Sequence, residues 1–160
     1  MSRHSGHNND VESAEVGKDR KARLLIRPAA EHDFPAIVRI QQHCPETAQW
    51  PLGDYSGFPV LVAQIGSVHV GFCSWRQSAP DEAEVLNLAV DPAWRRRGVG
   101  SALLAAVLER AQGTIFLEVA EPNSPAIALY RKQGWVDVGL RPGYYNHGTV
   151  NAVVMKKSSW

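Results

Sequence analysis

The chain has 160 residues, of which 44% are hydrophobic and 21% charged, as is ordinary for a soluble globular protein. Its formal net charge of +1 argues against a broad electrostatic surface for nucleic acid or anionic membranes, so any anion must bind locally. No apolar run approaches the roughly 20 residues of a membrane span, and the polar residues 1–23 do not resemble a secretory signal. Cys44 and Cys73 match no metal spacing and favour a reducing, cytoplasmic setting with both thiols structural.

The length fits a single domain with its own hydrophobic core. Residues 1–22 are polar and aperiodic, so we expect a disordered tail, followed by one folded domain over 23–160. In the tail, His4 and His7 lie three residues apart, which is weak evidence for a metal site. We therefore expect no metal.

The first half of the domain combines a strand, a helix and a hairpin. Residues 23–29 are predicted as a strand, and 34–44 as a helix with Asp33 at its N-cap or in its first turn. Residues 45–59 are rich in Pro and Gly and are expected to form a long loop with about one helical turn. Residues 60–77 are predicted as two strands around a tight Gly-Ser turn.

The second half alternates strands and helices. Its predicted elements are a strand over 81–92 that ends at Asp-Pro, an amphipathic helix from Val99, a nearly all-apolar strand over 114–120, a helix over 123–134 capped by Asn123, and two last strands over 135–140 and 149–157 joined by 141–148. A hairpin in the middle and alternation later predict a mixed α+β fold.

The turn RRRGVG, residues 95–100, lies between a strand and a helix. The first N–H groups of that helix have no intrahelical partners and carry the positive end of its dipole. Gly98 and Gly100 let an anion approach the backbone, and Arg95, Arg96 and Arg97 add charge. The motif therefore predicts a phosphate or pyrophosphate site, with a solvated basic turn as the alternative. It matches neither the P-loop nor the Rossmann pattern.

The stretch LNLAVDPAWRRRGVGSALL resembles the acyl-CoA signature of the GNAT superfamily of N-acetyltransferases, R/Q-x-x-G-x-G/A. The resemblance implies that the loop holds the CoA pyrophosphate and that the preceding strand hydrogen-bonds the pantetheine arm. The cofactor-binding residues implied are Leu88, Ala89, Val90, Arg95, Arg96, Arg97, Gly98, Val99, Gly100, Ser101 and Asn123. It also implies a mostly antiparallel sheet of about seven strands, flanked by about four helices and splayed between the fourth and fifth strands.

Over residues 84–156 the chain is similar to the bacterial family that acetylates the N-terminal alanine of a ribosomal protein, through LEVAEPNSPAIALYRKQGW and RPGYYN. Glu118 is the only charge in the strand over 114–120, where a carboxylate is costly unless paired, hydrated or used. The resemblance implies that Glu118 is the general base, acting through water. The alternative is a buried ion pair or a strand-end carboxylate.

Tyr130 lies on the helix that follows the Glu118 strand. A phenol can protonate a departing thiolate, and the resemblance implies this general-acid role, although an aromatic that packs on the sheet would fit the pattern equally. Asn123 caps the same helix, which alone would explain it. In the family the matching asparagine also contacts the cofactor.

The acceptor is expected to enter between two loops. Tyr144 and Tyr145 are candidate contacts on one side, and Trp50 and Tyr55 on the other, with packing on the sheet edge as the alternative for the tyrosine pair. Ala120 and Glu121 stand where related enzymes often carry a basic residue, and an acidic wall would favour a cationic N-terminus or a polyamine.

The predicted function is direct transfer of acetyl from acetyl-CoA to the N-terminal α-amine of a protein or peptide. The resemblance makes a ribosomal protein one candidate acceptor. The alternatives are the same chemistry on a lysine, polyamine or other small amine, and a catalytically silent acyl-CoA-binding module. We expect a monomer or weak dimer, with no direct contact to nucleic acid or membrane.

Overall fold

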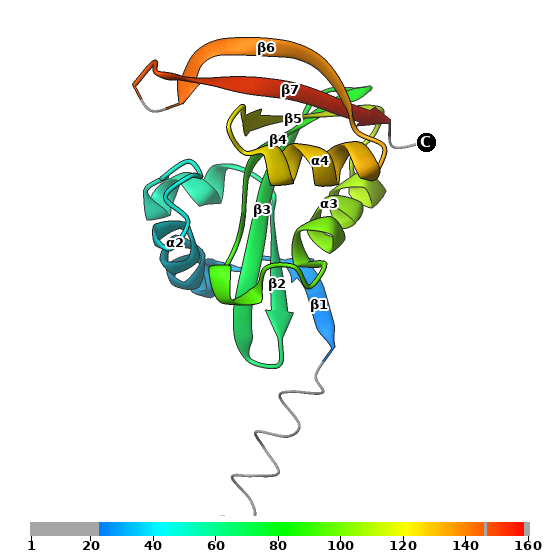
Figure 1. Cartoon of the computed structure of the whole chain (residues 1–160). Coiled ribbons are helices and arrows are strands. Elements are labelled where there is room, and N and C mark those ends of the chain that lie inside the picture. The colour runs from blue at the N-terminus through cyan, green and yellow to red at the C-terminus, as the bar shows by residue number, and fades with distance from the viewer. Residues whose placement is uncertain (1–22, 146, 159–160) are drawn as a thin grey trace, which may run out of the picture.

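The computed structural model describes residues 23–145 and 147–158. The predicted tail over 1–22 lies outside these described residues. One seven-stranded sheet runs through the molecule in the order β1-β2-β3-β4-β5-β7-β6 (Figure 1). Its strands are β1 (Leu24–Pro28), β2 (Val60–Ile65), β3 (Val68–Ala79), β4 (Glu82–Val90), β5 (Thr114–Ala120), β6 (Val136–Tyr145) and β7 (Val150–Ser158). Neighbouring strands are antiparallel except for β4 and β5, so the predicted mixed, mostly antiparallel sheet is confirmed.

Helices cover both faces of the sheet. They are α2 (Phe34–Gln42), α3 (Val99–Arg110) and α4 (Ser124–Lys132), with 3-10 turns η1 (Glu31–Asp33), η2 (Leu52–Gly57) and η3 (Pro92–Trp94). Leu103, Val107 and Ile127 of α3 and α4 pack into a core on one face, whereas Ile37 and Ile40 of α2 pack on the other face (Figure 1). No helix among the described residues is long and apolar enough to cross a membrane.

Asp33 directly precedes α2, as predicted, but its carboxylate caps nothing in that helix. The side chain is fully buried and accepts hydrogen bonds from Arg27 at 2.7 and 2.8 Å, from His69 at 2.8 Å and from the Ala30 N–H at 2.8 Å. Hydrogen bonding to Arg27 therefore holds the pKa of Asp33 well below its usual range. The residue joins β1, β3 and η1.

The segment 141–148 differs from the expected loop. Strand β6 continues to Tyr145, with an irregular register between Arg141 and Tyr145, and so places both tyrosines at a strand end. The Gly143 N–H donates to Asn151 Oδ1 at 3.0 Å, which ties this irregular part to β7. Pairing with β7 therefore keeps this segment in the strand, although Pro142 and Gly143 favour a turn.

Candidate active site

Strands β4 and β5 diverge in the middle of the sheet. Within the described chain they pair only over Glu82–Glu84 and Thr114–Phe116. On its other side β4 has a register shift against β3, where Ser74 faces Asn87 but Trp75 faces Val85, so that Leu86 forms a bulge. The predicted splay between the fourth and fifth strands is therefore confirmed. Among the described residues, the part of β4 after Glu84 has no strand pairing with β5.

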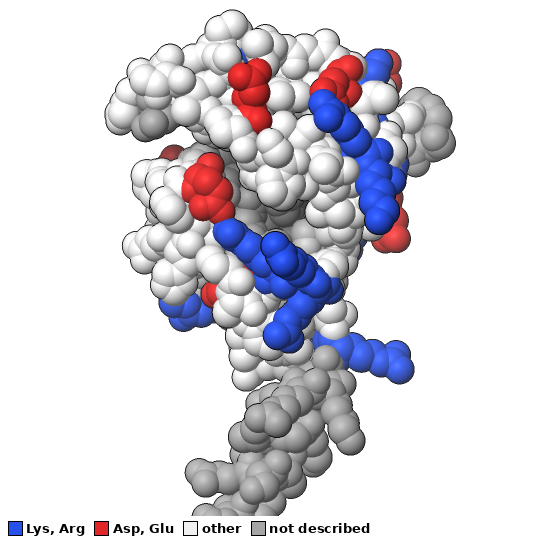
Figure 2. All heavy atoms as spheres, in the orientation of Figure 1, with Lys and Arg blue, Asp and Glu red and all other residues white. Residues whose placement is uncertain are grey.

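A pocket of about 110 Å³ lies in this splay. It is lined by residues of five parts of the chain: Glu46, Thr47 and Ala48; Val85, Leu86, Asn87 and Leu88 of β4; Leu117, Glu118, Val119 and Ala120 of β5; Asn123 and Tyr130 at the cap and within α4; and Tyr144 and Tyr145 of β6. Both predicted catalytic side chains thus share one pocket with both predicted acceptor tyrosines. Figure 2 shows the surface hollowed between the two halves of the sheet.

Glu118 lies on β5, opposite Val154 of β7, and its side chain is 25% exposed. Its Oε1 accepts a hydrogen bond from Arg141 Nη1 at 2.8 Å. The ion-pair alternative considered for this carboxylate is therefore present, but the partner is an exposed arginine of β6 and the carboxylate still borders the pocket. A half-buried carboxylate in this position can take a proton from a group in the pocket.

Tyr130 and Tyr145 border the same pocket from α4 and β6. Burial raises the pKa of each phenol to about 12, so both hydroxyls keep their protons at neutral pH. The Tyr130 ring also packs against Trp135, at 6.4 Å between ring centroids, so the packing role foreseen for Tyr130 coexists with its place in the pocket. The Tyr145 hydroxyl reaches the backbone carbonyl of Glu118 at 3.4 Å.

The turn over residues 95–98 is exposed and strongly bent before α3. Arg96 has φ +63° and Gly98 has φ +78°, a left-handed conformation that favours glycine. Helix α3 then begins at Val99, and no side chain of its N-cap residue caps its first N–H groups, which have no intrahelical partners. Arginine side chains gather on this surface (Figure 2), and the Arg97 guanidinium lies 4.9 Å from the centroid of the Trp94 ring. An anion site is compatible with this geometry.

Arg95 connects this turn to the segment that follows α2. Its guanidinium forms an ion pair with Glu46, its Nε donates to the Val90 carbonyl at 3.3 Å, and its Nη2 lies 3.5 Å from Cys44 Sγ. The Cys44 thiol donates to the same Val90 carbonyl at 3.3 Å. The end of β4, the basic turn and one wall of the pocket are therefore tied together.

Residues 25–135 match the model of the acetyltransferase (GNAT) family. The chain belongs to the GNAT family. Among its relatives is the N-alpha-acetyltransferase RimI of Mycobacterium tuberculosis, to which it is 39% identical over 92 residues. This match covers 57% of this chain and 58% of the relative. It is 31% identical over 144 residues to the ribosomal protein bS18-alanine N-acetyltransferase of Haemophilus ducreyi, covering 82% of this chain and 97% of the relative.

A solved GNAT structure, the ribosomal-protein-S18-alanine N-acetyltransferase from Escherichia coli, superposes with a TM-score of 0.73 at 28% identity, covering 85% of this chain and 94% of that one. In several curated relatives the match is shorter. The chain spans just over half the length of the relatives from M. tuberculosis and E. coli, 58% and 55% respectively. The chain therefore shares the family and the fold of these acetyltransferases.

The remaining predicted cofactor residues of this GNAT domain fall into two groups. Leu88 and Asn123 line the pocket, and Asn123 also caps α4 by accepting from the Ala126 N–H at 3.4 Å, so its expected structural role is confirmed. Ala89 is buried against the α2 side of the sheet, and Ser101 accepts a hydrogen bond from Gln133 near the end of α4. These two side chains have structural contacts of their own.

Trp50 and Tyr55 do not line the pocket, although the segment that contains them forms one of its walls, as expected. Tyr55 is fully buried, with its hydroxyl hydrogen-bonded to Gln41 and to Asn87 Nδ2, the latter at 3.1 Å. Trp50 packs on Tyr55 at 5.3 Å between ring centroids. The aromatic residues anchor the segment, and Glu46, Thr47 and Ala48 form the wall instead.

The sequence did not indicate a site role for Asn87, which lines the pocket, or for Arg141, which contacts the lining residue Glu118. Arg141 contacts Glu118, and Asn87 holds the pocket wall by donating to the Ala48 carbonyl at 3.0 Å. Asn87 is 5% exposed and is the one polar residue in the run Val85–Val90, which was the available signal. Arg141 carried no such signal, because an exposed arginine is ordinary on any surface.

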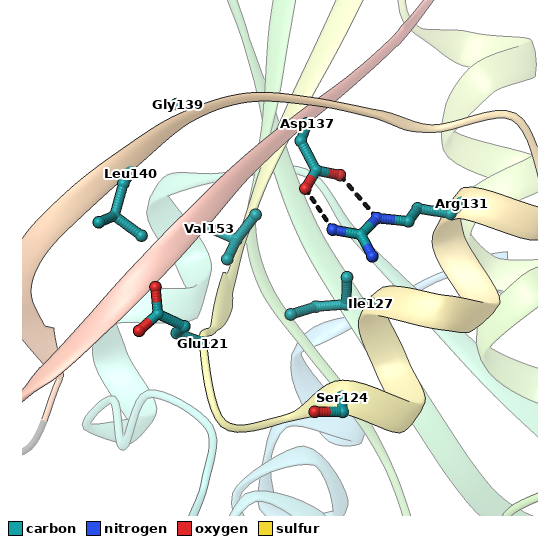
Figure 3. A pocket seen from close by; sticks show the side chains of 8 residues that line it. All are labelled: Glu121, Ser124, Ile127, Arg131, Asp137, Gly139, Leu140 and Val153. Carbon is teal, nitrogen blue, oxygen red and sulfur yellow. Dashed lines mark hydrogen bonds and ion pairs between the residues drawn. The ribbon is translucent and has the colours of Figure 1, made fainter.

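A second, wider cavity of about 520 Å³ lies between α4 and β6 and contains none of the predicted site residues. Figure 3 shows Ile127 and Val153 at its centre, Glu121 and Ser124 on one side, and the ion pair between Arg131 and Asp137 on the other. Glu121 thus borders this cavity and not the pocket at Glu118, where Ala120 lies. The acidic wall expected from Glu121 is therefore absent from the lining of the pocket.

Proposed function

We propose that this GNAT protein transfers an acetyl group from acetyl-CoA directly to the N-terminal α-amine of a protein or peptide. The observation that carries the proposal is the shared pocket of Glu118 and Tyr130 at the splay of β4 and β5. An α-amine suits this site because its pKa of about 7.7–8.0 leaves a substantial neutral fraction near pH 7, whereas a lysine, near 10.4, is far harder to deprotonate.

The residues present fit acetyl-CoA as the donor. The exposed turn at residues 95–98 and the start of α3 suit its pyrophosphate, and the free edge of β4 suits its pantetheine amides. The proposed phosphate-binding residues are Arg95, Arg96, Arg97, Gly98, Val99, Gly100 and Ser101, and the proposed pantetheine-binding residues are Leu88, Ala89 and Val90, with Asn123 beside them.

In the proposed reaction Glu118, through a water molecule, takes the proton of the attacking amine. A backbone N–H near Val90 polarises the thioester carbonyl and stabilises the tetrahedral oxyanion. Tyr130 then gives its proton to the departing CoA sulfur. We expect direct transfer without an acyl-enzyme, because neither Cys44 nor Cys73 lines the pocket. Burial also raises the pKa of Cys44, and that of Cys73 to about 12, which disfavours the thiolate.

The first acceptor to test is a peptide with a free N-terminal alanine, since the relatives above act on ribosomal protein alanine. Tyr144 and Tyr145 are proposed to line its path. A ribosomal acceptor would place the reaction in the cytoplasm. A polyamine or lysine acceptor would keep the fold and donor while changing the branch of the family.

The test compares Glu118→Gln with Glu121→Gln, a matched change at an exposed carboxylate that borders the other cavity. We expect Glu118→Gln to lower kcat by about 10²–10⁴-fold, the usual contribution of a general base, with acetyl-CoA binding retained. Glu121→Gln should acetylate at the wild-type rate. A Glu118→Gln protein as active as the wild type would remove Glu118 as the base.

A further inference from the structure

Arg141 forms a hydrogen-bonded ion pair with Glu118, the proposed general base. Its Nη1 donates to Glu118 Oε1 at 2.8 Å, and its side chain is 57% exposed, whereas that of Glu118 is 25% exposed. The carboxylate is therefore the more buried partner of the pair, and the guanidinium is the one more exposed to solvent. A partly buried carboxylate needs a counter-ion, and Arg141 provides it in the structure without an acceptor.

Tyr144 completes the surroundings of this guanidinium. The central carbon of Arg141 lies 4.8 Å from the centroid of the Tyr144 ring, a cation–π geometry. A carboxylate and an aromatic face are together a binding site for a cation. An α-ammonium, the main form of a peptide N-terminus at pH 7, has the charge and the hydrogen-bond donors to occupy the same place.

The pair between Arg141 and Glu118 is easily exchanged. An ion pair with one strongly exposed, flexible partner contributes little to stability, because water screens it and holding the long side chain costs entropy. The pair between Arg27 and Asp33 is different, since Asp33 is fully buried and has two further partners, His69 and the Ala30 N–H. Arg141 can therefore leave Glu118 at small cost.

We propose that Arg141 is an exchangeable counter-ion that the ammonium group of the acceptor displaces from Glu118 and Tyr144. The exchange keeps the charge at the carboxylate balanced before and after the acceptor binds. It makes Arg141 a competitor of the acceptor and a determinant of its charge: a cationic amine displaces the guanidinium, whereas a blocked, uncharged N-terminus does not. This inference rests on the proposed role of Glu118.

The test measures binding of an alanine-initiated peptide to the CoA-bound protein by calorimetry, with the same peptide acetylated at its N-terminus as the uncharged ligand. Arg141→Ala removes the competitor, and Arg141→Lys restores a cation. Arg131→Ala is the matched control, because Arg131 is 58% exposed and pairs with Asp137 away from Glu118. Steady-state kinetics on the same variants separates KM from kcat.

Arg141→Ala should bind the free-amine peptide about two- to fivefold more tightly, the range of an exposed ion pair. Its KM should fall by a similar factor with kcat within about twofold, Arg141→Lys should lie near the wild type, and the blocked peptide and Arg131→Ala should show no change. Weaker binding by Arg141→Ala, or a fall in kcat at constant KM, would overturn the proposal. Failure of the wild type to acetylate any peptide that it binds would instead overturn the proposed function.

Discussion

The hydroxyl of Tyr130 illustrates how burial prepares a single residue for its proposed task. A proton donor works only while protonated, and the pKa of Tyr130 is raised to about 12 by burial. The protonated form therefore predominates throughout the range in which an exposed phenol ionises. An exposed phenol would lose its proton near pH 10.

We predict that kcat of the wild type does not decline between pH 8 and 10 through ionisation of Tyr130. Tyr130→Phe, which removes the donor, should lower kcat about 10²-fold or more at every pH in this range without changing the shape of the profile. Stopped assays of CoA release over this range check the prediction. A decline near pH 10 that disappears in Tyr130→Phe would contradict it.

At this scale the sequence is informative where a residue departs from its local pattern. Glu118 is the single charge of a core strand, so it could be singled out from its neighbours alone. Tyr55 could not be placed in the same way, because its burial depends on Gln41 of α2 and Asn87 of β4, which are distant in sequence. Loop aromatics suggest exposure until their tertiary partners are known.

Among the secondary-structure elements, the start of α3 carries the proposed acyl-CoA site. Two glycines there have different roles. Gly98 has φ +78° with open space around its Cα, whereas a Cβ on Gly100 would meet Val90 Cγ2 at 3.6 Å, an ordinary contact. Backbone conformation therefore limits substitution at Gly98, whereas at Gly100 only the proposed acyl-CoA ligand would limit it.

We predict opposite effects for two alanine substitutions. Gly98→Ala should destabilise the protein by about 1–2 kcal/mol, the cost of a left-handed conformation for a residue with a Cβ. Gly100→Ala should leave the unfolding midpoint in urea unchanged or raise it, while weakening acetyl-CoA binding about tenfold, the loss of roughly one charge-assisted hydrogen bond. Denaturation and calorimetry check both, and Gly100→Ala with wild-type affinity would exclude close approach of the ligand there.

The strands and helices near the site were predictable because each has a strong local pattern and a clear stop. Strand β5 has the predicted bounds, 114–120, and α4 begins after Asn123 with Pro125 in its first turn. The end of β6 was not predictable, since Pro142 and Gly143 indicate a turn and the pairing with β7 lies several residues further along the chain.

Across the whole molecule, the site depends on contacts between elements that are distant in sequence. The ion pair between Arg95 and Glu46 joins the proposed phosphate-binding turn to the wall of the acceptor pocket. Arg141, from the last hairpin, reaches Glu118 in the sheet centre. The family followed from the resemblance of the sequence motifs, and that resemblance implied the sheet and its splay. These side-chain pairs required the structure, because nothing local to either partner specifies the other.

The central claim concerns the whole protein: acetyl transfer from acetyl-CoA to a free N-terminus. The most direct measurement incubates the full chain with acetyl-CoA and peptides beginning with Ala, Ser, Gly or Met, the same peptides blocked at the N-terminus but containing lysine, and spermidine, and locates the added acetyl group by mass spectrometry. We predict acetylation at the α-amine of free N-termini, with alanine preferred. Acetylation confined to lysine or spermidine would contradict the claim.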